Sequence, residues 1–185
     1  GAFWMGVNGF FWYDGSRVNS LDCDVHDHVF DDLNTAQITK AWAVSNGQYD
    51  EVWFFYPSAD SDEIYRYVAF NYAQNYWMMG ELARTSGFDR GVFRNPTMAG
   101  VNGRIYSHES GFNYDAASVY AESGPFRIGA GDNLAVITGM IPDEVNLGDV
   151  EATLKTRLYP TSAETSSGPY SMTNPTSVRV QGRQV

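Results

Sequence analysis

Hydrophobic and polar positions alternate in short runs along residues 38–80, and this pattern predicts four antiparallel β-strands. Asn46-Gly47-Gln48 separates the first two runs, and Asn-Gly supplies the positive φ that a tight hairpin needs. A second turn, rich in Ser, Asp and Pro, lies at residues 57–62, and Gly80 closes the last run. Four short strands in about 43 residues match the repeat length of a β-propeller blade. The four runs cover residues 38–45, 51–56, 64–71 and 76–79.

The second of these runs contains an unbroken aromatic series at residues 53–56. Such a series has no 3.6-residue period, so it favours a strand covered on both faces over an amphipathic helix. Propeller sheets bury both faces of their middle strands in this way. We therefore expect the packing between neighbouring blades to depend on Trp42, Val52, Phe54, Tyr67 and Trp77.

Three short runs with Gly-containing turns between them precede this region and predict most of another blade. They cover residues 2–5, 10–13 and 17–21. A short helix is predicted at residues 25–33, where apolar residues recur at helical spacing. Asp24 is its predicted N-cap, and Asn34 marks its end.

A third blade is predicted to begin at residues 97–108, where two runs flank the hairpin signal Asn102-Gly103. Residues 118–122 and 126–128 are expected to continue it. From Asn133 onward the runs become longer, which predicts a different β layer. These runs cover residues 134–141, 150–159 and 177–185, with a connector rich in Ser, Thr, Gly and Pro at residues 160–175.

The sequence therefore predicts an all-β protein with propeller blades of four antiparallel strands, a C-terminal β-sandwich-like layer and one short helix. Residues 1–130 are expected to form a partial β-propeller of about three blades. Residues 131–185 are expected to form a β-rich, platform-like segment that is incomplete. Because the chain begins and ends in strand-like runs, we expect it to be a segment of a longer polypeptide.

The composition agrees with a folded protein, since 43% of the 185 residues are hydrophobic and 15% are aromatic. No apolar run approaches the ~20 residues that span a bilayer, so no membrane span is expected. The single Cys23 excludes an internal disulfide, and Asn95 and Asn174 are each followed by Pro, which leaves no N-glycosylation site. These features permit assembly in a reducing cytoplasm.

The net charge of −10 is unevenly distributed along the chain. Residues 1–150 hold 20 acids and 8 Lys or Arg, whereas residues 151–185 hold 2 acids and 4 Lys or Arg. Affinity for DNA phosphates grows with the number of cationic contacts, and the chain has no basic cluster. Wide contact with nucleic acid is therefore not expected, although an acidic surface that repels DNA remains open.

The residues most suggestive of metal binding lie at positions 22–28, where two imidazoles and several carboxylates are close in sequence. If the segment is helical, His26 and His28 lie roughly 200° apart and do not share a metal ion. A solvated acidic face is the favoured interpretation. The candidate ligands are Asp22, Cys23, Asp24, His26, Asp27 and His28.

Ser107, His108 and Glu109 bring a hydroxyl, an imidazole and a carboxylate together in sequence. They lie in a predicted strand, so alternation points His108 away from both neighbours. A nucleophile–base contact within the trio is therefore not predicted.

Asp60, Asp62 and Glu63 offer oxygen ligands for calcium, but the EF-hand pattern is absent and an exposed turn is favoured. Residues 45–53 depart from the Ser-x-Asp-x-Gly-x-x-Trp turn of propellers that hydrolyse sialic acids. The sequence therefore predicts no catalytic residue, no cofactor and no metal ligand.

Several segments, in their order along residues 9–111, resemble the hub or nozzle proteins of short-tailed bacteriophages, also called packaged-DNA stabilisation proteins. A looser likeness extends over residues 131–143, and no single motif carries the resemblance. The similar segments are residues 12–15, 25–37, 50–57, 66–72, 77–85 and 106–111.

The resemblance implies a structural role in the virion of a podovirus. Members of this family carry a propeller beside a β-sandwich platform and assemble as a homo-oligomeric ring, implied to be a hexamer, below the portal. The implied partners are portal or adaptor proteins and tail fibre or spike proteins. DNA would pass through without specific binding, and assembly would occur in the host cytoplasm. The family has no catalytic residues.

Two other function classes stay open from the sequence. The first is a propeller that binds a glycan or a receptor, which Trp and Tyr exposed in a groove would favour. The second is a glycan-cleaving propeller enzyme, which two carboxyls facing each other across a pocket would favour.

Overall fold

A computed structural model describes residues 1–111, 119–128, 133–143 and 150–185. Strands hold 46% of these residues and helices 8%, which confirms the predicted all-β class. The chain forms two compact units, residues 1–118 and 119–185. Their boundary lies earlier in the chain than the expected one between residues 130 and 131.

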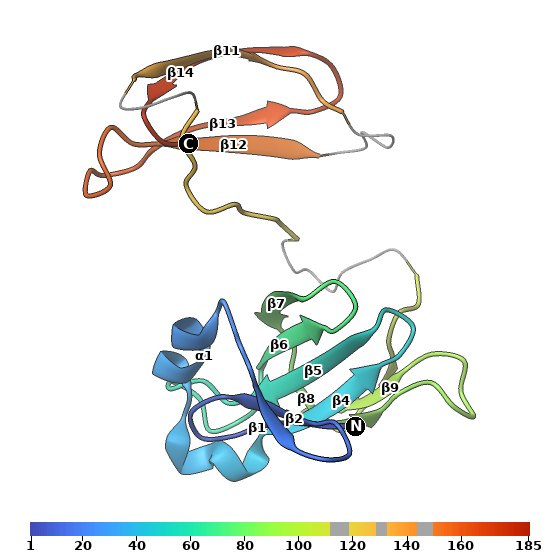
Figure 1. Ribbon diagram of the computed structural model, residues 1–185. Helices are drawn as coiled ribbons and strands as arrows, with labels where there is room; N and C mark the ends of the chain where they lie inside the picture. Colours follow the sequence, from blue (N-terminus) through green and yellow to red (C-terminus); the bar gives the residue numbers. More distant parts are fainter. Residues whose placement is uncertain (112–118, 129–132, 144–149) are drawn as a thin grey trace. The chain divides into compact units, whose positions relative to one another are not determined.

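The first unit is built around a four-stranded antiparallel sheet with the order β4-β5-β6-β7, as predicted (Figure 1). The chain passes to the next strand by a hairpin each time, so neighbours in sequence are neighbours in the sheet. The four strands are β4 (Trp42–Asn46), β5 (Glu51–Tyr56), β6 (Arg66–Asn71) and β7 (Tyr76–Glu81).

The predicted ends of these strands need three corrections. The first strand begins at Trp42 rather than at residue 38, because the 3₁₀-helix η1 (Thr35–Lys40) occupies the preceding residues. The Asn34 side chain caps η1 by accepting a hydrogen bond of 3.1 Å from the amide of Ala36. The third strand begins at Arg66 rather than at residue 64, and the fourth continues through Gly80.

Gly80 continues β7 because it lies opposite Tyr67 on β6. A Cβ atom at Gly80 would lie 2.7 Å from the Tyr67 ring, so the ring covers the position that a side chain would fill. Gly80 therefore supports pairing at this position rather than ending it.

The β4–β5 turn departs from the expected Asn-Gly geometry. Asp50, with φ of 58°, takes the left-handed conformation in this turn. Gly47 is needed for a different reason, because its amide donates a 2.8 Å hydrogen bond to Asp89 and a Cβ would approach that carboxylate to 2.9 Å. The later Asn102-Gly103 signal is confirmed, since Gly103 has φ of 75°.

Strand β5 is buried on both faces, as its aromatic series predicts. Val52 and Phe54 belong to one cluster of buried side chains, and Phe55 belongs to a second cluster on the opposite face. The five predicted core residues divide between these clusters: Val52, Phe54 and Trp77 in the first, and Trp42 and Tyr67 in the second.

A three-stranded sheet and helix α1 (His26–Asp32) cover the first face. Phe10 is fully buried there, with its ring centroid 4.9 Å from that of Phe54 and 4.8 Å from that of Trp77. The helix confirms the predicted one, but Val25 rather than Asp24 occupies the N-cap, and no side chain caps it. The covering strands are β1 (Ala2–Met5), β2 (Phe10–Tyr13) and β3 (Val18–Leu21), in the order β1-β2-β3.

A second three-stranded sheet, with the order β10-β9-β8, covers the opposite face. Its buried Met98 packs into the second cluster, and the Arg84 guanidinium lies over the Tyr106 ring at 4.0 Å. Strand β8 was not predicted, because its sequence, Arg-Thr-Ser-Gly-Phe, lacks an alternating apolar pattern. The strands are β8 (Arg84–Phe88), β9 (Thr97–Gly100) and β10 (Ile105–Ser107).

The second unit contains two two-stranded antiparallel sheets, β11–β14 and β12–β13. Val178 and Val180 on β14 are buried. Strands occupy parts of all three predicted runs, but β11 and β12 have six residues each and are no longer than β5, β6 and β7. The connector expected at residues 160–175 is wrong, because β13 lies within it. The strands are β11 (Ala135–Met140), β12 (Glu151–Thr156), β13 (Thr165–Ser171) and β14 (Thr176–Gly182).

The predicted continuation of a third blade through residues 118–122 and 126–128 is also wrong for the part that the structure describes. Residues 119–126 form no strand, and Arg127 makes a bridge to Gln184 inside the second unit. Residue 118 lies outside the described residues.

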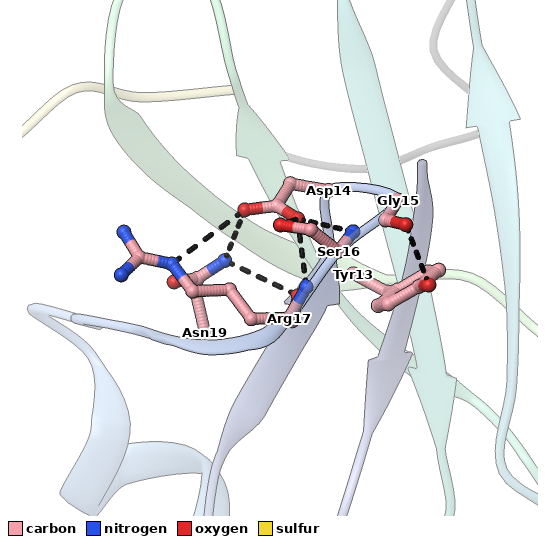
Figure 2. Close-up of polar contacts among 6 residues, drawn as sticks. All are labelled: Tyr13, Asp14, Gly15, Ser16, Arg17 and Asn19. Atoms are coloured by element: carbon pink, nitrogen blue, oxygen red, sulfur yellow. Dashed lines mark hydrogen bonds and ion pairs between the residues drawn. The ribbon is translucent and has the colours of Figure 1, made fainter.

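The β2–β3 turn is held by the Asp14 carboxylate (Figure 2). It accepts hydrogen bonds from the amides of Ser16 at 2.8 Å and Arg17 at 2.9 Å, and from the Asn19 side chain at 3.1 Å. The bonds from the Arg17 and Ser16 amides are the main causes that lower the pKa of Asp14. Gly15, between Asp14 and Ser16, has a φ of 105°, which glycine adopts readily.

Replacing Phe54 by Ala should lower the free energy of unfolding by about 3–5 kcal/mol, because the lost ring would leave a cavity between two packed sheets. Phe93, which is 58% exposed, is the matched control, and Phe93→Ala should change stability by less than about 0.5 kcal/mol. Chemical denaturation of both variants measures the difference. Equal stabilities would contradict the burial assigned to Phe54.

Replacing Asp14 by Ala should speed hydrogen exchange at the amides of Ser16 and Arg17, because both lose their acceptor. Asp14→Asn keeps a side-chain oxygen at the same position and should preserve most of the protection. Amide exchange followed by NMR at neutral pH provides the measurement. Unchanged exchange in the Ala variant would show that the turn does not depend on this side chain.

Candidate functional site

Two carboxylates from distant parts of the chain meet at the end of the central sheet. The side-chain amide of Asn46 donates hydrogen bonds to Glu51 at 3.3 Å and to Glu109 at 3.1 Å. Glu51 is only 8% exposed and also accepts a 2.7 Å hydrogen bond from the Trp53 indole. Glu109 reaches this position from a backbone with φ of 53°, the left-handed conformation. We call Asn46, Glu51 and Glu109 the acid pair cluster.

The electrostatics of this cluster favour a proton on Glu109. Burial of the side-chain carboxyl raises the pKa of Glu109, and the negative charge of Glu51 raises it further. The hydrogen bond from Asn46 acts in the opposite direction and lowers this pKa. Burial is the largest cause that raises the pKa of the nearby Tyr67, and the negative charges of the same two carboxylates raise it further. The side-chain oxygen Oδ1 of Asn46 is buried and has no hydrogen-bond partner among the described residues. The two carboxylates are therefore joined through the side-chain amide of Asn46, and that amide is only half satisfied.

An apolar hollow of about 780 Å³ lies on the outward face of the β8–β10 sheet. The rings of Phe88 and Phe93 lie 6.1 Å apart in its wall, and Ile105 is 76% exposed. Alternation along the strands explains this face: Met98 and Tyr106 form a cross-strand pair, and Met98 packs against the central sheet, so Thr97 and Ile105 point away from it. We call the outward surface around Phe88, Phe93 and Ile105 the β9 face.

The outward face of the β1–β3 sheet is apolar as well. Trp4 and Phe11 form a cross-strand pair with their rings stacked at 5.8 Å. Tyr13 and Val18 form the next exposed pair, and Val18 is 58% exposed. We call the surface around Trp4, Phe11, Tyr13 and Val18 the β1 face.

The candidate metal ligands at residues 22–28 make other contacts in the structure. His26 begins helix α1, and its two ring nitrogens lie 3.0 Å from the Asp27 carboxylate and 3.1 Å from the carbonyl oxygen of Asn8. These two contacts raise the pKa of His26. Burial raises the pKa of Cys23 to about 11, so its thiol stays protonated at neutral pH. Over the described residues, no group of His, Cys, Asp and Glu is arranged to hold a metal ion.

The trio Ser107, His108 and Glu109 separates in the structure. His108 accepts a 3.0 Å hydrogen bond from the Arg84 guanidinium, whereas Glu109 bonds to Asn46. Sequence reasoning missed the pairing of Glu109 with Glu51, because the two lie far apart along the chain and neither neighbourhood has a motif.

The acidic turn with Asp60, Asp62 and Glu63 is joined to η1 by an ion pair. The Lys40 ammonium lies 2.7 Å from the Glu63 carboxylate, and the Gln37 side chain donates a 3.5 Å hydrogen bond to Asp62. Asp60 and Glu63 are exposed. The turn therefore has the surface position that the sequence favoured.

No protein-family model matches the chain, and no curated protein matches it significantly. Among the described residues, no helix is long and apolar enough to cross a membrane.

Replacing Glu109 by Gln should raise the free energy of unfolding at neutral pH, because the variant keeps an acceptor for Asn46 and removes the repulsion from Glu51. The raised pKa means that the folded wild type binds more protons than the unfolded chain above pH ~4.5. Wild-type stability should therefore fall as the pH rises through this window, and the variant should show a flatter profile.

Thermal unfolding from pH 4 to pH 8 measures this effect. Glu81→Gln makes the same change of charge at an exposed strand position and serves as the control. A Glu109→Gln variant that is less stable than wild type at neutral pH would contradict the repulsion assigned to the pair.

Proposed function

We propose that the chain is a structural, non-enzymatic part of the tail of a short-tailed phage. In this proposal it belongs to the hub or nozzle ring below the portal, where the ring closes the DNA exit channel and retains the packaged genome. The protein works mechanically, and its place is the virion after assembly in the host cytoplasm.

The stacking of three antiparallel sheets is the observation that carries this proposal. The central β4–β7 sheet packs one face on the β1–β3 sheet through Phe10 and the other on the β8–β10 sheet through Met98. Neighbouring propeller blades pack through their faces in the same way. The second unit has two small antiparallel sheets, which agrees with the expected platform-like segment. The sheet stacking in the first unit and the small sheets of the second unit both agree with the resemblance to the tail hub family.

The charge distribution supports a channel that DNA slides through. Residues 1–118 contain 15 acids and 7 Lys or Arg, a balance of −8. Carboxylates facing a channel raise the energy of bound phosphates, so the genome does not stop at the wall as it passes. The family resemblance adds portal or adaptor proteins above the ring, fibre or spike proteins around it, and six subunits in the ring.

The observations bear differently on the two alternative functions. The hollow of the β9 face is lined by the apolar Phe88, Phe93 and Ile105, and also by polar residues whose side chains can hydrogen-bond sugar hydroxyls, among them Arg94, Asn95 and Ser107. Glu51 and Glu109 share one amide donor and do not line that hollow. The hollow therefore keeps a glycan-binding propeller as the second candidate, whereas a glycan-cleaving one has no carboxyl pair there among the described residues.

Immunoelectron microscopy of the phage particle that carries this chain is the direct test of location. Antibodies raised against the purified chain should bind at the tail vertex, and particle averages should show a closed ring with an axial pore. Labelling spread over the capsid surface would overturn the proposal.

Binding of the chain to duplex DNA should stay weaker than micromolar at low ionic strength, where cationic attraction is least screened. A gel-shift titration at low salt measures it, and a basic DNA-binding protein serves as the positive control. Submicromolar, salt-sensitive binding would contradict the sliding channel.

A further inference from the structure

The acid pair cluster brings three side chains with oxygen atoms together at the end of the central sheet. The carboxylates of Glu51 and Glu109 lie 3.3 Å and 3.1 Å from the same amide nitrogen of Asn46. Neither carboxylate forms an ion pair with a Lys or Arg in the part of the chain that the structure describes. Acids in such a position are stabilised by a cation, because a half-buried negative charge needs a partner.

The Asn46 side chain points to a ligand independently of the two charges. Asn46 is 2% exposed, and its Oδ1 atom has no hydrogen-bond partner among the described residues. The two bonds that join Oδ1 to the amide nitrogen are about 1.2 Å and 1.3 Å long, so Oδ1 lies within about 6 Å of both carboxylate oxygens. A buried amide oxygen binds a hydrogen-bond donor or a cation. Beside two carboxylates, a cation is favoured.

The distances in the cluster match those between neighbouring oxygen ligands of Ca²⁺. A half-turn about the last side-chain bond of Asn46 exchanges the places of Oδ1 and the nitrogen, and this torsion has two broad minima. Oδ1 would then lie 3.3 Å and 3.1 Å from the two carboxylate oxygens. Oxygen ligands at about 2.4 Å from Ca²⁺ lie about 2.8–3.4 Å apart where they are neighbours, whereas those around Mg²⁺ lie about 2.9 Å apart. The cluster therefore fits the larger ion.

The same half-turn is unfavourable when no cation is bound, because it brings three oxygens together and leaves the amide nitrogen without an acceptor. The Trp53 indole holds Glu51 in place for either orientation through its 2.7 Å hydrogen bond, and its ring stacks on that of Tyr67 at 4.7 Å. Glu109 is an exposed residue, so water reaches one side of the cluster and can complete the coordination of an ion.

We propose that Glu51, Glu109 and the side-chain oxygen of Asn46 bind one calcium ion. The third ligand is an amide, so the site differs from a group of three or more His, Cys, Asp or Glu, of which the described residues contain none. The ion links the segment after β10 to the β4–β5 hairpin. Because the site has only two anionic ligands, we expect a dissociation constant of about 0.1–1 mM. The inference does not depend on the proposed role in a phage tail.

Thermal unfolding of the full chain tests the site, with calcium chloride as the probe. In about 5 mM calcium the wild type should gain at least about 2 °C in Tm over the chain in a chelator, because the ion binds only the folded state. The same concentration of magnesium should give less than half of this shift. Glu109→Gln should lose the calcium response, although in the chelator it should be more stable than wild type because the repulsion from Glu51 is removed. Glu81→Gln, at an exposed strand position, is the matched control and should respond like wild type.

Asn46→Asp separates binding of an ion from a merely structural role of this side chain. The variant loses the donor that both acids share, so without metal it should be less stable than wild type. It also gains a third anionic ligand, so calcium should bind at least about tenfold more tightly and raise Tm by more than in wild type. If the metal-free variant does not fold, calcium should restore its unfolding transition. A variant that is destabilised and gains no calcium response would contradict the proposed site.

Terbium luminescence locates the bound ion. Tb³⁺ replaces Ca²⁺ at oxygen sites and emits when an excited indole close to it transfers energy, and the Trp53 indole bonds directly to Glu51. Excitation of Trp should therefore give terbium emission that calcium displaces, that Glu109→Gln largely removes and that Glu81→Gln retains. A wild type without a calcium response, or with an equal response to magnesium, would overturn the inference. Terbium emission that is unchanged in Glu109→Gln would also overturn it, because the ion would then lie at other acids.

Discussion

Burial of both faces of β5 is the constraint on which the first unit depends. A strand with Phe54 on one side and Phe55 on the other is covered only when a separate layer packs on each face of its sheet. The chain supplies one layer before the central sheet and one after it, and each has an apolar inner face. The two outer layers are only three strands wide and carry apolar residues on both sides, so covering the central sheet leaves two further apolar faces at the ends of the stack. The exposed surfaces of this protein thus follow from the way in which its core is covered.

The sequence predicted the central sheet well because its signals there are local. Strands with alternating or fully apolar patterns, separated by turns rich in Gly, Asn, Asp and Pro, specify a meander without any knowledge of distant contacts. Where the local signal was weak, the prediction was wrong: β8 and β13 are rich in Ser, Thr and Gly, and their extended form depends on pairing with other strands. The turn at Asp50 shows a related limit, because an Asn-Gly pair predicted the hairpin but not which residue takes the left-handed conformation.

The acid pair cluster was beyond sequence reasoning for a physical reason. Glu51 begins a central strand, and Glu109 follows the last strand of an outer sheet, so only the packing of one sheet on another brings them together. Like charges this close cost stability unless a proton or a donor lies between them, and Asn46 supplies one donor to both. The side-chain oxygen Oδ1 of Asn46 has no partner among the described residues, which is uncommon for a buried amide. The cluster joins the segment after β10 to the β4–β5 hairpin through the two hydrogen bonds that the Asn46 side chain donates.

The distribution of charge connects this architecture with the proposed role in a ring. An acidic protein that assembles with itself must overcome repulsion between its copies, and a uniformly acidic surface would prevent contact at low salt. Here five of the six Asp of residues 1–33 lie at residues 22–32, in and beside helix α1, while residues 82–111 carry a balance of +2. In the proposed ring, the acidic balance of the first unit would keep DNA phosphates from the channel wall, so contact between copies would have to form where the acidic residues are few.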